Sequence, residues 1–233
     1  MLRNLFVRFI LIIIATSLLI FVEYKFEVVD YLRFVNSATT LEGSSIVYSS
    51  DGEMMAVGRV TVFKTSENKK PKKNLQIEIR KVSDHSLITA IDTSTTSNLT
   101  FNPDNSLIAA GNSLGKVYVW RIGDGELLFS FDHKINVNSL MMSFLSFTQG
   151  GQKIVTLISG VLSSSSNQVN VWDLANETNR TLAGEFTSAV LSSGGETLAL
   201  GNRDNRTVDL YRLDDLTLIK QLDVSQIPIT PKF

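Results

Sequence analysis

Short hydrophobic runs separated by tight turns recur along this chain from about residue 45 to residue 222. The turns fall at Asp51-Gly52, Asp104-Asn105, Gly150-Gly151 and Gly194-Gly195. Beyond three of them lies a run that alternates in polarity or is wholly apolar and ends on an aromatic residue: Val117–Trp120, Val169–Trp172 and Val208–Tyr211. Short runs of this kind between turn residues are typical of β-strands. The pattern therefore predicts an all-β fold over most of the chain.

The repeats predict four successive units, and a repeat of four short strands is the signature of a β-propeller blade. We expect a β-propeller-like array of about four four-stranded blades over residues 45–223. The predicted blades cover residues 45–92, 97–132, 143–183 and 187–223, and a C-terminal tail follows at 224–233. The predicted strands are 46–49, 54–63, 75–82, 87–91, 99–101, 107–110, 117–122, 127–131, 144–147, 154–158, 169–174, 180–182, 189–191, 197–200, 208–213 and 218–222.

The segment before the repeats is apolar enough to cross a membrane. Residues 9–22 read FILIIIATSLLIFV, and extending the run back to Leu5 gives 18 residues interrupted only by Arg8. A helix of that length is about 27 Å long, close to the ~30 Å hydrocarbon core of a bilayer. We predict one transmembrane α-helix, a signal anchor, at residues 1–23 and a stalk at residues 24–44.

The charges beside this segment predict its orientation. Arg3 and Arg8 precede most of the apolar run, so the positive-inside rule places the N-terminus in the cytoplasm and the repeats outside it. A cleaved signal peptide is the alternative, but no pair of small residues spaced for cleavage follows Val22. The expected protein is a single-pass membrane protein with an extracytoplasmic repeat domain, and secretion after cleavage is the alternative.

Three motifs recur in the same order within the repeats. The first strand runs into a turn that reads YSSDG at 48–52, FNPDN at 101–105 and FTQGG at 147–151. The second strand carries MAVG at 55–58, IAAG at 108–111 and LALG at 198–201. The third strand closes on Trp120-Arg121, Trp172-Asp173 or Tyr211-Arg212. Together the motifs resemble the WD-repeat (WD40-type) family of β-propellers, in a degenerate form, over residues 45–222.

Each recurring residue type has a structural role. The Gly or Asn residues of the turns can adopt the positive φ of a two-residue hairpin. The Ala and Gly residues of the second strand let neighbouring blades approach closely, and Trp120 and Trp172 supply large apolar faces between blades. We therefore assign no catalytic, cofactor-binding or metal residue, and the sequence does not identify the residues that bind a partner.

The chain also departs from the family pattern. The family often keeps a Gly-His pair before the first strand and an Asp in the turn before the third, as parts of a buried hydrogen-bonded network. Here Asp132-His133 approximates the first position but is set too far from Phe144, and Asp204 approximates the second. The resemblance then implies that most blades lack the network. His133 is expected to be a structural or surface residue rather than a ligand or a base.

The number of blades leaves ring closure open, because closed WD propellers usually resemble seven-bladed rings. Two copies of the chain can close a ring together, or another protein can supply the missing blades. The reading frame can also be truncated, or a four- or five-bladed ring can close with the help of residues 224–229. The sequence leaves all four alternatives open.

The composition narrows the possible chemistry. The chain has no cysteine, which excludes disulfides and thiolate metal sites. Its only histidines are His85 and His133, too few for a zinc centre built from imidazoles. The formal net charge of −1 gives no reason to expect nucleic acid as a partner. No Gly-rich phosphate loop or nucleophile elbow occurs.

These observations favour a membrane-tethered WD-repeat scaffold, a protein–protein interaction module without catalytic activity or cofactor. The expected partners are a protein of unknown identity and the membrane, and a homo-oligomer that completes the ring is a further option. One alternative is an extracytoplasmic propeller enzyme of the hydrolase or dehydrogenase type. Another is a truncated propeller fragment with no independent function.

Overall fold

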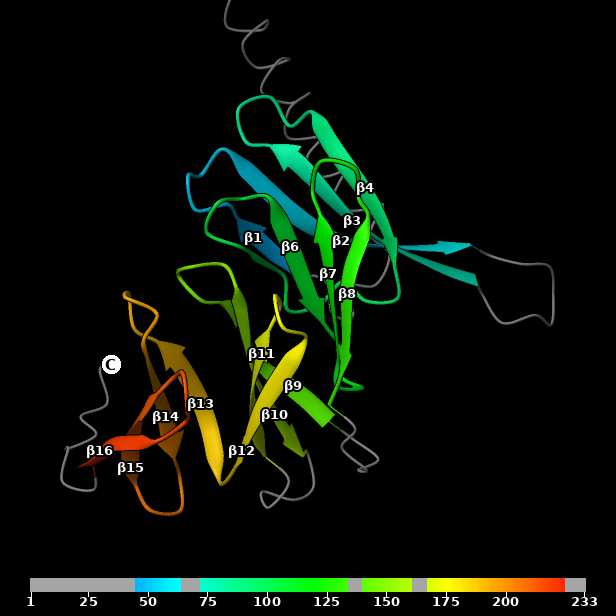
Figure 1. The fold of residues 1–233 in the computed structure, drawn as a ribbon. Helices are drawn as coiled ribbons and strands as arrows, with labels where there is room; N and C mark the ends of the chain where they lie inside the picture. The colour runs from blue at the N-terminus through cyan, green and yellow to red at the C-terminus, as the bar shows by residue number, and fades with distance from the viewer. Residues whose placement is uncertain (1–44, 64–71, 134–139, 161–166, 225–233) are drawn as a thin grey trace, which may run out of the picture. The chain divides into compact units, whose positions relative to one another are not determined.

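The computed structural model describes residues 45–63, 72–133, 140–160 and 167–224. Sixteen strands over these residues form four antiparallel sheets, each with its four strands in chain order (Figure 1). The sheets lie in the compact unit that residues 42–60 and 74–233 form, apart from the far ends of two strands. The prediction of about four four-stranded sheets is confirmed.

Each sheet is a meander of consecutive strands. Sheet 1 consists of β1 (Ile46–Tyr48), β2 (Met54–Phe63), β3 (Lys72–Lys81) and β4 (Leu87–Thr93). Sheet 2 consists of β5 (Thr100–Phe101), β6 (Leu107–Gly111), β7 (Lys116–Arg121) and β8 (Leu127–Asp132). Sheet 3 consists of β9 (Leu140–Phe147), β10 (Lys153–Gly160), β11 (Gln168–Asp173) and β12 (Thr178–Ala183). Sheet 4 consists of β13 (Phe186–Leu191), β14 (Thr197–Asn202), β15 (Thr207–Arg212) and β16 (Leu218–Asp223).

The largest difference from the expected strands is at β9, which begins at Leu140 rather than at residue 144. The pairing of β9 with β10 shifts by one residue at Leu157/Ile158 and then continues from Met142 back to Leu140. A β-bulge of this kind changes which residues face the core. It allows Met142 to be buried in a cluster with Val117.

The turn between the first and second strands is wider than the two-residue hairpin expected. In sheet 1 the amide of Ser49 donates to the carbonyl of Met54, so the loop spans residues 50–53. The residues Gly52, Asn105, Gly151 and Gly195 have φ between 60° and 73°. The positive φ was predicted correctly, and the turn is a longer one in which the third of four loop residues is left-handed. The hydroxyl of Ser49 bonds to the carboxylate of Asp51 and accepts from the amide of Met54, which holds the wider loop.

The hydrophobic core lies between consecutive sheets. One cluster joins sheets 1 and 2 and includes Ile77, Ile79, Ile108 and Trp120. The cluster between sheets 2 and 3 consists of Ala109, Val119, Phe147, Ile154, Trp172 and Leu174. The cluster between sheets 3 and 4 includes Val155, Leu157, Leu198 and Leu200. Fully burying one large aliphatic side chain contributes about 1.5–3 kcal/mol, so these clusters are the main source of stability. The interpretation of both tryptophans as core residues is confirmed.

Two glycines of the second strands permit this close approach. A Cβ added at Gly58 would collide with the backbone carbonyl oxygen of Thr96, which leads into sheet 2. A Cβ added at Gly111 would collide with the side chain of Met142 in sheet 3. The expected role of small residues between neighbouring sheets is therefore confirmed at both positions.

The N-terminal predictions concern residues that the structure does not describe. The expected transmembrane helix at 1–23, the stalk at 24–44 and nearly all of the tail at 224–233 lie outside the described residues. Within the described part of the chain, no helix has the length and apolar character needed to span a bilayer.

We predict that Gly58→Ala lowers the free energy of unfolding by about 1–3 kcal/mol, the usual cost of overpacking. The backbone carbonyl of Thr96 cannot rotate away from the new methyl group as a flexible side chain could. Urea unfolding followed by the fluorescence of the two buried tryptophans, Trp120 and Trp172, measures the change. Gly123→Ala is the control, because no atom lies within 4 Å of its added Cβ. Equal stability of the two variants would contradict the close packing at Gly58.

Candidate functional site

An open pocket of about 400 Å³ lies where the connection from β4 to β5 meets the connection from β6 to β7 and the start of β9. Its lining combines small hydroxyl side chains, two amides and three longer apolar side chains. The lining residues are Leu75, Ser94, Thr95, Thr96, Ser97, Asn98, Asn112, Ser113, Met141 and Met142.

Hydrogen bonds within the protein hold the loops of this pocket. The hydroxyl of Thr95 donates to the carbonyl oxygen of Gly111 over 3.3 Å, and the amide of Asn98 donates to the same oxygen over 3.4 Å. The side-chain oxygen of Asn112 accepts from the amides of Leu114 and Lys116, each over 3.0 Å. Asn98 has φ of 49°, a left-handed conformation that Asn tolerates better than most residues. The pocket wall is therefore preformed rather than shaped by a ligand.

The pocket lining contains hydroxyl groups but no ionisable side chain that would activate a hydroxyl as a nucleophile. None of its lining residues is Asp, Glu, His, Lys, Arg or Cys. The side chain of Met141 is 55% exposed at its edge. The flexible thioether side chain can contact an apolar residue of a ligand. The neighbouring hydroxyls and amides can hydrogen-bond a peptide backbone.

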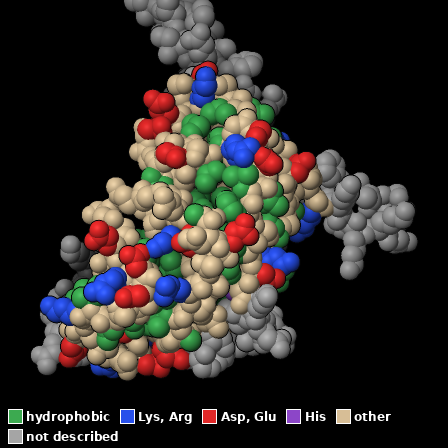
Figure 2. Space-filling model, viewed as in Figure 1, with side chains coloured by type: hydrophobic (Ala, Val, Ile, Leu, Met, Phe, Trp, Pro, Cys, Tyr) green, Lys and Arg blue, Asp and Glu red, His purple; other side chains and the backbone are tan. Residues whose placement is uncertain are grey.

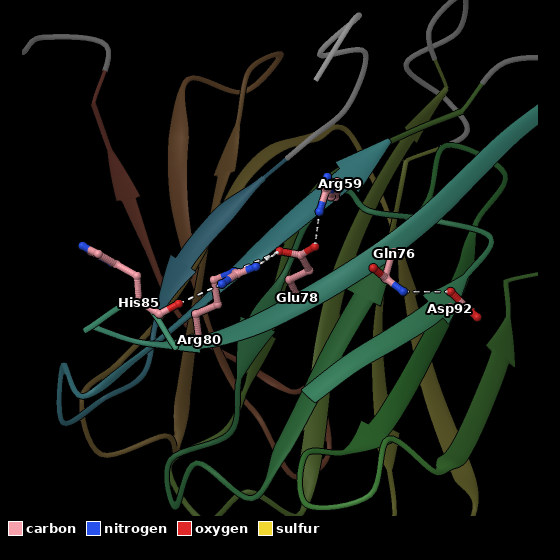
Figure 3. Close-up of polar contacts among 6 residues, drawn as sticks. All are labelled: Arg59, Gln76, Glu78, Arg80, His85 and Asp92. Carbon is pink, nitrogen blue, oxygen red and sulfur yellow. Dashed lines mark hydrogen bonds and ion pairs between the residues drawn. The ribbon is translucent and has the colours of Figure 1, made fainter. Parts of the chain in front are cut away.

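A charged cluster lies on the face of sheet 1 that is turned away from sheet 2. Nη1 of Arg59 lies 2.6 Å from one carboxylate oxygen of Glu78, and Nη2 of Arg80 lies 2.8 Å from the other (Figure 3). Arg80 also donates to the carbonyl oxygen of His85 over 2.7 Å. Burial acts to raise the pKa of Glu78, but the hydrogen bonds and positive charges of Arg59 and Arg80 outweigh it and lower the pKa. The carboxylate is therefore ionised at neutral pH and bound by both guanidinium groups.

His133 bridges sheets 2 and 3. Its Nδ1 contacts the carbonyl oxygen of Gly115, which can only accept, so Nδ1 carries the proton and Nε2 accepts from the hydroxyl of Thr156 at 2.7 Å. The ring also packs edge-on against Trp172, with centroids 5.3 Å apart. Burial lowers the pKa of His133, although the bond to Gly115 and the charge of Asp132 act to raise it. The imidazole is a neutral structural bridge, as the sequence suggested.

The expectation that His133 stands too far from the third repeat was wrong. The chain between His133 and β9 is longer than the family pattern allows, yet the ring still reaches Thr156 on β10 and Trp172 on β11. Part of the buried network therefore forms in sheet 3. Spacing along the chain could not show this, because contact depends on where the connection returns. The indole N–H of Trp172 has no partner among the residues described.

Charged side chains do not gather into a field of one sign on the face that Figure 2 shows, where acidic and basic groups are interspersed with hydrophobic patches. Among the described residues, no three His, Asp or Glu side chains lie close enough to hold a metal ion. Among the described residues, the pocket and the Glu78 cluster are the two arrangements of polar groups that we consider as candidate sites.

Comparison with known proteins supports the architecture. No family model and no curated protein matches the sequence. A solved structure similar to this chain is the β-propeller domain of Cps50 (Swd1) from Myceliophteria thermophila, with a TM-score of 0.58 and 11% sequence identity. The match covers 80% of this chain and 57% of that one. The chain has a WD-repeat-like β-propeller fold. Sheets 1 to 4 are accordingly called blades 1 to 4 below.

The propeller fold explains where the pocket lies and why sequence reasoning missed it. The strands that carry the recurring motifs form the blades, whereas the pocket is built mainly from the connections at 94–98 and 112–113. Connections carry little periodic signal, and their Ser, Thr and Asn residues resemble ordinary loop composition. Glu78 and Arg80 gave no signal either, because an alternating charged strand looks solvent-exposed in sequence.

We predict that Glu78→Ala destabilises blade 1, because it removes the buried carboxylate that both Arg59 and Arg80 bind. The pKa of Glu78 is lowered from its ordinary 4.5, so the stabilisation is complete above that pH and is lost as the pH falls below it. Urea midpoints measured between pH 7 and pH 3 should converge for the wild type and the variant. Asp124→Asn, which breaks an exposed pair with Arg121, serves as the control and should change the midpoint little. A constant difference at every pH would contradict the ionised cluster.

Proposed function

We propose that this protein is a membrane-tethered, non-catalytic propeller scaffold that binds an extended segment of a partner protein. The observation that carries the proposal is the pocket formed by the connections at 94–98 and 112–113, which has hydroxyls, amides and an exposed methionine but no ionisable side chain. Such a lining can hold a peptide backbone and one apolar side chain. It offers no ionisable side chain to act as a general acid or base, or to activate its hydroxyl groups as nucleophiles.

The rigidity of the pocket favours recognition. The carbonyl oxygen of Gly111 accepts from Thr95 and Asn98, which ties the connection from β4 to β5 to the end of β6. A preformed site loses less conformational entropy when a partner binds, so a modest contact area can still give useful affinity. Conserving rigid blades while presenting variable connections is the usual way in which a scaffold carries function.

The membrane tether is the part of the proposal that rests on the sequence alone. Residues 5–22 are long enough to cross the hydrocarbon core as a helix. Arg3 and Arg8 favour a cytoplasmic N-terminus, which places the blades on the other side of the membrane. A tethered scaffold would meet its partner at the membrane surface.

Site-specific photo-crosslinking tests the binding pocket. We predict that a photoreactive residue replacing Ser113, at the pocket edge, gives one discrete crosslinked product in intact membranes. The same residue replacing Leu127, which is exposed on β8 and does not line the pocket, is the matched control. Adding Met141→Asp should abolish the product from position 113, because a carboxylate would replace the apolar contact. Identical products from positions 113 and 127 would refute a pocket-directed partner.

The absence of cysteine allows a direct test of topology. We predict that a membrane-impermeant maleimide labels Gln152→Cys, an exposed position in the turn before β10, in intact cells. Asn4→Cys should be labelled only after the membrane is permeabilised, because positively charged flanks retain the N-terminus in the cytoplasm. The reverse labelling pattern would overturn the proposed orientation, and release of the labelled domain into the medium would indicate signal cleavage.

A further inference from the structure

The face of blade 4 that is turned away from blade 3 is mainly apolar, with Ser188 and Lys220 among its polar residues, and is uncovered among the described residues. Leu198 and Leu200 point into the cluster with blade 3, so the alternating residues of β14 point the other way. Ala199 pairs with Val190 of β13 on one side and with Leu210 of β15 on the other, so the three side chains lie on the same face of the sheet. Val190 is 60% exposed, and Ala199 and Leu210 are half-buried. We call Val190, Ala199, Gly201, Val208, Leu210 and Leu222 the trailing face.

One backbone hydrogen bond recurs in every blade and shows which positions are equivalent. The amides of Val82, Ile122, Leu174 and Leu213 donate to the carbonyls of Glu53, Ser106, Gln152 and Glu196, respectively. Ala199 lies three residues after the acceptor of this bond in blade 4, and the residues at that position in blades 1 to 3 are Ala56, Ala109 and Val155. All three are fully buried. Val208 and Leu210 correspond to Val117 and Val119 in blade 2, which are also fully buried. In blades 1 to 3 the next blade covers this face.

Blade 1 also exposes hydrophobic residues, on the face that is turned away from blade 2. Tyr48 pairs with Met55 just as Phe101 pairs with Ile108, so Tyr48 and Phe101 are equivalent. Phe101 is 8% exposed because it packs against blade 1, whereas Tyr48 is 60% exposed. Ile46, two residues earlier on β1, is 64% exposed. We call Ile46, Tyr48, Met55 and Val57 the leading face.

A hydrogen bond that joins blades 1 and 2 involves a position whose equivalent in blade 4 is Lys220. The hydroxyl of Thr89 on β4 donates to the carbonyl oxygen of Ile122 in blade 2, at the start of the turn that contains Asp124. Thr89 pairs with Ile79 and Lys220 pairs with Leu210, which are equivalent positions in blades 1 and 4.

The turn of blade 1 that corresponds to the Asp124 turn carries an acid. The amide of Lys81 donates to Ser86 as that of Arg121 donates to Glu126, so Asp84 corresponds to Asp124. Asp84 is exposed and its pKa is lowered by hydrogen bonds from the hydroxyl and amide of Ser86, so it is ionised. A blade 1 that packed on the trailing face would bring Asp84 close to Lys220.

We propose that two copies of this chain pack head to tail, the trailing face of each against the leading face of the other. The packing would repeat the one that already joins blades 1 to 4. Two identical contacts related by a two-fold axis would close a ring of eight blades, within the four to eight that propellers contain. Lys220 of each copy would pair with Asp84 of the other.

The charged cluster of blade 1 suits a contact between separate chains. Counting from the recurring hydrogen bond, Arg80 occupies the position of Trp120, Trp172 and Tyr211, the aromatic residues that pack on the preceding blade. Arg59, Glu78 and Arg80 lie on the same side of blade 1 as the leading face and make that side more polar than the faces within the chain. Interfaces between proteins that also exist apart are more polar than cores. If the membrane tether holds, it raises the local concentration of copies and favours the contact.

Charge exchange provides the decisive experiment. Light scattering on the full-length protein in detergent should find a dimer for the wild type and monomers for Lys220→Glu and Asp84→Lys alone. Mixing these two variants should restore a dimer, because each of its two contacts then joins opposite charges. A mixture that stays monomeric would overturn the proposal. Tryptophan fluorescence checks that each variant is folded.

An apolar substitution provides the second arm. Val190→Arg should abolish the dimer, and Leu127→Arg, at an exposed residue outside both faces, should leave it intact. A wild-type monomer, an open series of longer oligomers, or a dimer that Val190→Arg does not affect would each overturn ring closure by a second copy. A monomer bound through Val190 to a different protein would also overturn it. Crosslinking from position 113 reports on the pocket independently, so loss of the dimer and loss of the partner are distinguishable.

Discussion

Each four-stranded sheet of this protein presents two faces, and the requirement to cover them governs the rest of the structure. Ile154 and Trp172 cover one side of blade 3 against blade 2, while Val155 and Leu157 cover the other against blade 4. No sheet has a core of its own, so stability accumulates from the contacts between neighbours, as in other repeat proteins. The same requirement makes the end blades the places where the chain can gain most from a further contact.

Close packing of the blades also shapes the polar parts of the molecule. The small residue Gly58 lets the connection from β4 to β5 lie close to blade 1, because a Cβ there would collide with Thr96. Thr95 and Asn98 of the same connection donate to the carbonyl oxygen of Gly111 in blade 2. The uncharged lining of the candidate binding site is therefore held at the junction of the first two blades.

Buried polar groups stabilise the blades in two different ways. His133 takes a structural place between blades 2 and 3 by bonding Gly115 and Thr156. Blade 1 replaces the aromatic residue of the third strand with Arg80 and compensates with Glu78 and Arg59. Arg80 and His133 are both hydrogen-bonded in these positions, because an unpaired polar group in the interior costs more than a lost apolar contact.

The sequence by itself determined the strands, their grouping into four sheets and the core role of both tryptophans, because alternation and turn residues are local signals. It did not reveal the wider turns, the early start of β9 or the contact of His133 with Thr156. The pocket, and the residues that form the two uncovered faces, also appeared only in the tertiary structure. Which side chains meet across blades depends on where each connection leads the chain into the next blade and on how closely the backbones approach. The spacing of residues along one strand determines neither.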